Sequence, residues 1–147
     1  MARDDIVDGL NTLLSDYMVH YQKLRNYHWN VKGHEFFKLH EKFEEAYLQT
    51  AQWADDLAER ILALGAQPIS TLNDFTAHSR LDEDPEAPSA EQMVANLIED
   101  IEQLNNWSRD LAELAEESQD RTTTNLLDDI VDLQEERLWM FRTFLRD

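Results

Sequence analysis

The chain has 147 residues, no cysteine, and 31 acidic against 13 basic side chains, which gives a formal net charge of −18. This length fits one domain over residues 1–147, with a core large enough to fold without disulfides. The absence of cysteine excludes disulfides, thiolate metal sites and cysteine nucleophiles, so a metal would have to bind nitrogen and oxygen. The negative charge repels nucleic-acid phosphates and anionic lipid but attracts cations.

The N-terminal segment contains Asp4, Asp5 and Asp8 and lacks the basic and apolar regions of a secretory signal. No apolar run approaches the roughly 20 residues that would span a bilayer. We therefore expect a soluble, cytoplasmic protein that makes no membrane contact.

Three glycines and three prolines leave long unbroken segments, in which apolar residues recur at the three- and four-residue spacing of helices. The first such stripe runs from Ile6 to about Val31. A short turn at Gly33 leads to a second predicted helix from Phe36 to Leu64, which Gly65 ends.

Residues 66–88 hold all three prolines and predict a long crossover with a short helical turn near residues 72–75. Ser89 and Gln92 resemble a capping box for a third helix that ends near Glu117. Asp120 or Thr122 can cap the last helix, whose inward residues are expected to be Leu126, Leu127, Ile130, Leu133, Leu138, Phe141 and Leu145. Two hairpins joined by one crossover predict an all-α, ferritin-like four-helix bundle.

Four possible metal ligands share one face of the second predicted helix: His40, Glu44, Asp55 and Glu59. Glu44 and Asp55 lie about 16 Å apart along the axis, too far for one ion or a two-ion cluster to bridge. His28 precedes Gly33 by nearly as many residues as His40 follows it, so antiparallel helices bring both imidazoles to one level. The missing carboxylates would then come from a second subunit across a two-fold axis.

Imidazole and carboxylate ligands suit Fe(II), Mn(II) and Zn(II). No histidine has a glutamate three residues before it, which disfavours a metal site inside the bundle core. Each of these residues also has an ordinary structural explanation, since Asp55 and Glu59 can simply pair with Arg60 or Arg137.

Three segments carry a family resemblance. Residues 26–33 (NYHWNVKG) and 36–43 (FFKLHEKF) resemble the first signature of the Dps mini-ferritins, and residues 55–61 (DDLAERI) resemble the second. Trp139 and Met140 are similar to the family's last helix. The resemblance covers essentially the whole chain.

The resemblance implies a dodecameric cage with ferroxidase centres at two-fold interfaces. Each centre would bind one or two irons through His28, His40 and Glu44 of one subunit and Asp55 and Glu59 of another. Zn or Mn could take the place of iron. Such an enzyme oxidises Fe(II) with hydrogen peroxide or oxygen and stores ferric mineral, which protects against oxidative damage. The alternative is a cage that binds metal without turnover or structures the nucleoid.

Further roles follow from the same resemblance. Trp29 and Trp53 would supply electrons near the centre, although interface packing is the better explanation for Trp53. Glu41 and Glu45 would nucleate mineral, or are solvated charges, while Asp120, Asp128, Asp129 and Asp132 would line a pore.

The chain departs from the family pattern at Glu44 and Asn125, where aspartate is usual. It also carries no basic terminal arm, so direct DNA binding is not expected.

Overall fold

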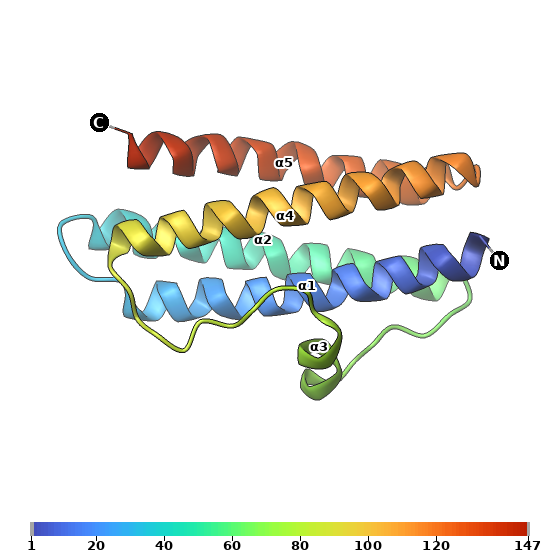
Figure 1. The fold of residues 1–147 in the computed structure, drawn as a ribbon, viewed down its shortest axis with the longest axis horizontal. Coiled ribbons are helices and arrows are strands. Elements are labelled where there is room, and N and C mark those ends of the chain that lie inside the picture. The colour runs from blue at the N-terminus through green and yellow to red at the C-terminus, as the bar shows by residue number, and fades with distance from the viewer. Residues whose placement is uncertain (1, 147) are drawn as a thin grey trace.

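The fold consists of two antiparallel helical hairpins joined by one long connection. A computed structural model describes residues 2–146, and within that range there are five helices and no strand. The long helices are α1 (Ala2–Asn30), α2 (Phe36–Ala63), α4 (Ala90–Glu117) and α5 (Arg121–Leu145), and α3 (Leu72–His78) is a short helix. Helix α1 pairs with α2, α4 pairs with α5, and α1 also packs against α4 (Figure 1). The predicted all-α bundle with one crossover is confirmed.

The helix ends follow local signals in the sequence. Gly33 and Gly65 adopt positive φ angles of 105° and 85° after α1 and α2, a conformation that costs glycine little. The Ser89 hydroxyl accepts the Gln92 N–H at 3.2 Å, but the Gln92 side chain donates to Asn96, so only half of the capping box forms. Asp120 caps α5 by accepting the Thr123 N–H.

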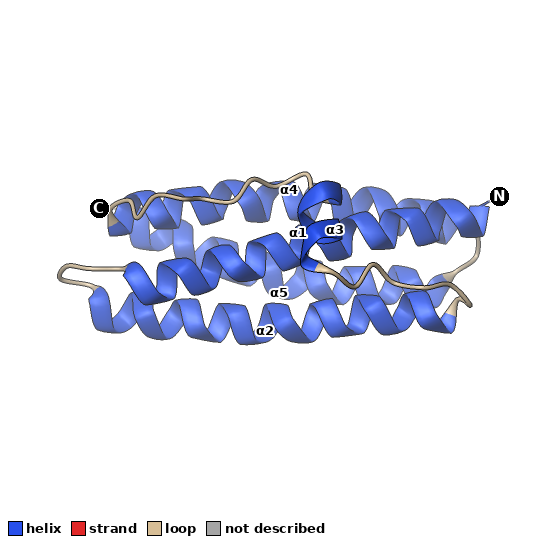
Figure 2. Ribbon diagram, turned by 90° about the horizontal axis from the view of Figure 1, so that it is seen from below, coloured by secondary structure: helices blue, strands red, loops and turns tan. Residues whose placement is uncertain are grey.

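The crossover runs along the outside of α1, with α3 standing off the bundle near its middle (Figures 1 and 2). The fully buried Asp16 carboxylate accepts the Arg80 backbone N–H at 2.6 Å and its guanidinium at 2.6 and 3.0 Å. Farther along, the Tyr27 hydroxyl donates to the Asp84 carboxylate. These contacts hold the crossover against the bundle. No helix within residues 2–146 combines the length and the apolarity of a membrane span.

The interior contains two apolar clusters at opposite ends of the bundle. One surrounds Leu10, Leu57 and Leu127, and the other surrounds Phe43 and Leu97. Between them lies a set of polar side chains that we call the mid-bundle layer: His20, Lys23, Asp100, Asn105, Ser108, Gln134 and Arg137.

The inward face of α5 differs from the prediction at two positions. Leu133 and Leu145 are 46% and 37% exposed, whereas Gln134 is fully buried. Gln134 lies four residues after Ile130 and four before Leu138, so it occupies the inward stripe that the helical period defines. Its side chain donates to the buried Tyr17 hydroxyl at 3.4 Å.

Candidate metal centre

Two histidines meet where α1 turns into α2. The His28 and His40 rings stack with centroids 3.7 Å apart and an interplanar angle of 17°. His28 Nδ1 lies 2.6 Å from the His40 carbonyl oxygen, and His40 Nδ1 lies 2.7 Å from the His28 carbonyl oxygen. A carbonyl oxygen only accepts, so each Nδ1 carries the hydrogen and Nε2 is the ring nitrogen that can bind a metal.

Neighbouring side chains support this pair and add a carboxylate. The Phe36 ring stacks on His40 at 5.0 Å, and Tyr47 places its edge against His28 at 5.3 Å. Glu44 Oε1 lies 3.6 Å from His28 Nε2, and half of the Glu44 side chain is exposed. The buried imidazole and the accessible carboxylate therefore present nitrogen and oxygen atoms of the kinds that can bind a metal.

Asp55 and Glu59 lie elsewhere on the same helix. Both are exposed on α2, and the rise of the helix places Asp55 about 16 Å from Glu44 along the axis. Asp55 lines a groove of 370 Å³ with Phe75 and Ile69 of the crossover. Within residues 2–146 no group of three or more His, Asp or Glu side chains is arranged to hold a metal ion. Within one chain, the candidate ligands therefore lie in two groups that are too far apart to bind the same ion.

The competing explanation for these two carboxylates was pairing with an arginine. Arg60 instead donates to Asp120 and Thr123, both at 2.9 Å. Arg137 lies over the Trp53 ring, with its guanidinium carbon 5.8 Å from the ring centroid. Both arginines are thus engaged away from Asp55 and Glu59, which leaves the two carboxylates accessible.

The two tryptophans occupy different environments. Trp29 is 57% exposed beside the histidine pair, with the Arg25 guanidinium 4.9 Å above its ring. Trp53 is 3% exposed and packs edge-on against Tyr17 at 5.9 Å. Trp53 is therefore a core residue of a single chain, whereas Trp29 is available at the surface.

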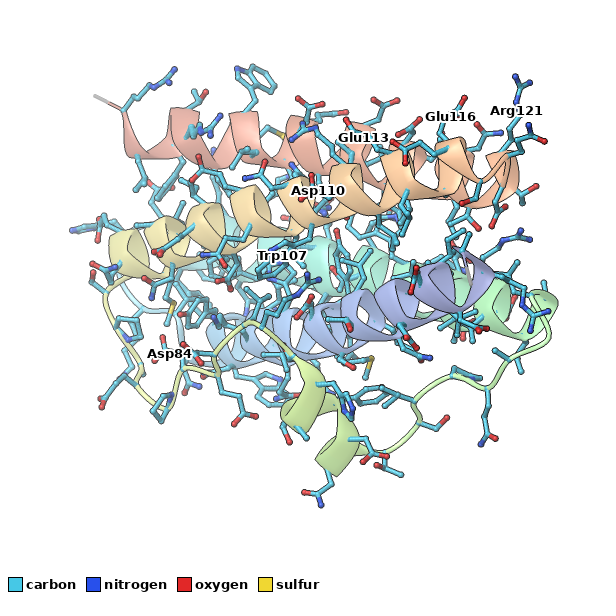
Figure 3. All side chains as sticks on the ribbon, turned by 45° about the vertical axis from the view of Figure 1, so that its right-hand side comes forward. Asp84, Trp107, Asp110, Glu113, Glu116 and Arg121 are labelled. Atoms are coloured by element: carbon cyan, nitrogen blue, oxygen red, sulfur yellow. The ribbon has the colours of Figure 1, made fainter. Side chains whose placement is uncertain are left out.

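The remaining acidic positions fall into two groups. Glu41 and Glu45 are both exposed on α2, and Glu45 pairs with Lys42 at 2.9 Å. Asp120 is occupied by the helix cap and Arg60, whereas Asp128, Asp129 and Asp132 are exposed on α5. Acidic side chains also project along α4, where Figure 3 shows Asp110, Glu113 and Glu116 on one outer edge.

Sequence reasoning did not identify the aromatic support of the histidines. Phe36 stands four residues before His40 on α2, and Tyr47 stands three residues after Glu44. Residues at this spacing share a helix face, so the aromatic residues flanking the ligands were a usable signal.

The comparisons of this sequence with known proteins agree with one another. A family model for the ferritin-like domain matches residues 7–147. The chain is 39% identical over 140 residues to "DNA protection during starvation protein 2" of Bacillus anthracis, covering 95% of this chain and 96% of that protein. It is also 39% identical over 142 residues to "General stress protein 20U" of Bacillus subtilis, covering 97% and 98% of the two chains.

Solved structures agree with these relatives. Dps from Staphylococcus aureus superposes with a TM-score of 0.95 and 37% identity, covering 98% of this chain and 97% of that one. A Dps protein from Vibrio cholerae, described as a member of a broad superfamily of ferritin-like diiron-carboxylate proteins, superposes with a TM-score of 0.96 and 35% identity, covering 99% and 91%.

The bundle with its single crossover thus has the ferritin-like fold. Within that class the chain belongs to the Dps mini-ferritins, as the resemblance of its signatures implied.

Proposed function

We propose that this protein oxidises Fe(II) at centres shared between two subunits and stores the ferric product inside a dodecameric cage. The observation that carries the proposal is the incomplete ligand set at His28, His40 and Glu44, with two accessible carboxylates too far away on the same helix. A two-fold axis that brings Asp55 and Glu59 of another subunit to the histidines completes the set twice in each dimer.

The ligand chemistry supports iron as the substrate. Imidazole nitrogen and carboxylate oxygen suit Fe(II), and also allow Zn(II) or Mn(II) to bind. In the proposed reaction two Fe(II) ions together give two electrons to one hydrogen peroxide, whose O–O bond breaks; both oxygen atoms end at the oxidation level of water or hydroxide, and hydrolysis of the ferric product releases protons. Both electrons of the peroxide reduction come from iron, so no hydroxyl radical is formed. Oxygen is the alternative oxidant.

Individual side chains have separate proposed roles. His28 and His40 bind through Nε2 because their Nδ1 hydrogens are held by backbone carbonyls. Glu44 carries a longer side chain than the aspartate usual in the family, and its 3.6 Å approach to His28 Nε2 supports direct contact with the same ion. Exposed Trp29 is placed to give an electron to a stray oxidant, and the buried Trp53 is a slower donor.

The acidic surface supports iron uptake and argues against DNA as a direct partner. Glu41 and Glu45 are proposed to start mineral growth, and Asp128, Asp129 and Asp132 to attract iron toward a pore, with Asp120 serving mainly as a helix cap. Relatives carry the name "DNA protection during starvation protein". With a net charge of −18 per chain, we propose that any protection by this protein acts through iron and peroxide, because phosphates are repelled.

The test is anaerobic loading with Fe(II) followed by one addition of hydrogen peroxide, with ferric absorbance and residual peroxide both measured. Wild type should consume both reagents rapidly, and the double variant Asp55→Ala, Glu59→Ala should not. A matched control is Glu113→Ala, Glu117→Ala, which removes two exposed carboxylates at the same spacing on α4 and should behave as wild type. Equal rates in all three proteins would favour a cage that binds metal passively.

A further inference from the structure

The mid-bundle layer contains all the buried side-chain polar atoms that lack a hydrogen-bond partner within residues 2–146. These atoms are His20 Nδ1, Asn105 Oδ1, Ser108 Oγ, Gln134 Oε1 and Arg137 Nη1. They come from three helices, α1, α4 and α5, and lie at the level where the two apolar clusters meet. Buried polar atoms in folded proteins almost always have a partner, in the protein or in ordered water.

These side chains surround the buried Tyr17 ring. Gln134 Nε2 donates to the Tyr17 hydroxyl at 3.4 Å, and the His20 ring lies 6.3 Å from the Tyr17 ring. The Ser108 hydroxyl also lies close enough to the Tyr17 hydroxyl to lower its pKa, although burial dominates and raises that pKa to about 12. Asn105 precedes Ser108 by three residues, so both project from the same face of α4.

The mixture of donors and acceptors selects the kind of ligand. The Asn105 and Gln134 oxygens accept hydrogen bonds, the Arg137 nitrogen donates, and the Ser108 hydroxyl does both. An anion would oppose the two amide oxygens, and an apolar molecule would leave every atom unsatisfied. Water both donates and accepts, and a buried water commonly makes two to four such bonds.

The local charge opposes a metal ion. The one carboxylate of the layer, Asp100, is held by Lys23 Nζ at 2.8 Å and also faces His20 Nδ1 at 3.7 Å, beyond hydrogen-bond distance. Burial lowers the pKa of His20, which favours its neutral form, and Arg137 adds a positive charge. A divalent cation would therefore enter a buried region that already carries excess positive charge.

We propose that the mid-bundle layer is a binding site for a small cluster of ordered water molecules and that it holds no divalent cation. Ferritin-like di-iron proteins hold metal between the helices of the bundle core, whereas we expect the mid-bundle layer of this chain to hold water. The bound water joins α1, α4 and α5 by hydrogen bonds and fixes their axial alignment. This inference is independent of the interfacial centre, which lies at the α1–α2 turn.

Crystals of the assembled protein, soaked anaerobically in Zn(II) and measured with anomalous diffraction, test the inference. Ordered water should bridge Ser108 Oγ and Gln134 Oε1, with no zinc peak in the layer. A zinc ion bound by His20 or Asp100 would overturn the proposal, and so would a dry layer whose side chains pair directly. A zinc ion bound at His28 and His40 would support the proposed function and would not bear on the water site in the mid-bundle layer.

A pair of adjacent asparagines provides the matched variants. Asn105 is 2% exposed, whereas Asn106 is exposed on the same helix. Asn105→Leu should lose at least one ordered water from the layer, and Asn106→Leu should keep all of them. An unchanged water cluster in Asn105→Leu would contradict the site. If that variant fails to assemble, the wild-type electron density decides whether the layer holds ordered water.

Discussion

His28 and His40 each donate their Nδ1 hydrogen to the other's backbone carbonyl oxygen, at 2.6 and 2.7 Å. This reciprocal pair uses carbonyls near the end of α1 and the start of α2, so the backbone itself fixes both ring orientations. Backbone acceptors cannot be removed by a side-chain substitution. The pair therefore keeps both Nε2 atoms available for metal as long as the α1–α2 hairpin is folded.

Glu44 should contribute directly to metal affinity. Its carboxylate lies 3.6 Å from His28 Nε2, and Glu44→Gln removes the charge at nearly constant shape. We expect Zn(II) binding, measured by anaerobic calorimetry, to weaken by at least roughly tenfold, since even outer-shell partners are worth 10–100-fold. Glu99→Gln, which removes an exposed carboxylate on α4 that has no proposed role, is the control. Wild-type affinity in Glu44→Gln would show that Glu44 is not a ligand.

The buried carboxylate of Asp16 should hold the crossover in place. Asp16→Ala leaves the Arg80 backbone N–H and guanidinium without their acceptor, which we expect to lower the free energy of unfolding by about 2–3 kcal/mol. Limited proteolysis should then cut the crossover faster. Asp82→Ala, at an exposed position of the same segment, should change neither property. A wild-type cleavage rate in Asp16→Ala would argue that other contacts hold the crossover.

Asp120 should make stability depend on pH in the acidic range. Burial, the largest influence, would raise the pKa of Asp120, but hydrogen bonds from Thr123 and the Arg60 charge together lower it below its ordinary value of 3.8. The folded state therefore favours the ionised form. This contribution to stability is complete above the ordinary pKa and is lost as pH falls through the lower folded pKa.

Asp120→Asn keeps a capping oxygen but no longer titrates. Its urea midpoint should therefore fall less steeply than that of wild type between about pH 5 and pH 3. Asp120→Ala should also lose the cap, at a cost of about 1 kcal/mol at neutral pH. Asp110→Asn, an exposed carboxylate on α4, serves as the control. Identical pH slopes for Asp120→Asn and wild type would refute the assignment.

Gln119 ends α4 in a strained conformation. It has a φ angle of 64°, and the next N–H, of Asp120, donates to the Ala115 carbonyl at 2.8 Å. Glycine adopts this conformation at little cost, so Gln119→Gly should stabilise the protein by about 0.5–1 kcal/mol in urea unfolding. Gln103→Gly, inside the same helix, should destabilise it by about 1 kcal/mol. A loss of stability in Gln119→Gly would contradict this account.

Much of the fold was predictable because helix ends carry local signals. Gly65 and Ser89 placed the end of α2 and the start of α4 to within about a residue. The short helix α3 begins where the turn was predicted, with the Thr71 hydroxyl accepting the Asp74 N–H as its cap, and extends beyond the predicted turn to His78. The crossover contacts of Asp16 depend on residues 64 positions away, which no local pattern reveals.

The candidate site was predictable only in part. The nearly equal spacing of His28 and His40 from Gly33 placed the two rings together, because antiparallel helices pair residues symmetrically about a turn. The reciprocal hydrogen bonds were not predictable, since they depend on how closely α1 and α2 pack at the turn and on the rotamers of both side chains. Gln134 was missed because a polar residue on an inward stripe looks like an interruption until its partner Tyr17 is known. The two-subunit origin of the carboxylates stays a prediction.

The most direct test of the shared centre is complementation between two inactive subunits. One subunit carries His28→Phe and His40→Phe, which keep ring stacking, and the other carries Asp55→Ala and Glu59→Ala. Each alone should lack peroxide-dependent Fe(II) oxidation. Co-expressed with different affinity tags and purified as mixed cages, they should regain about one quarter of wild-type activity, because random assembly pairs an intact histidine half with an intact carboxylate half in one quarter of the centres. Mixed cages as inactive as both parents would contradict a centre shared between subunits.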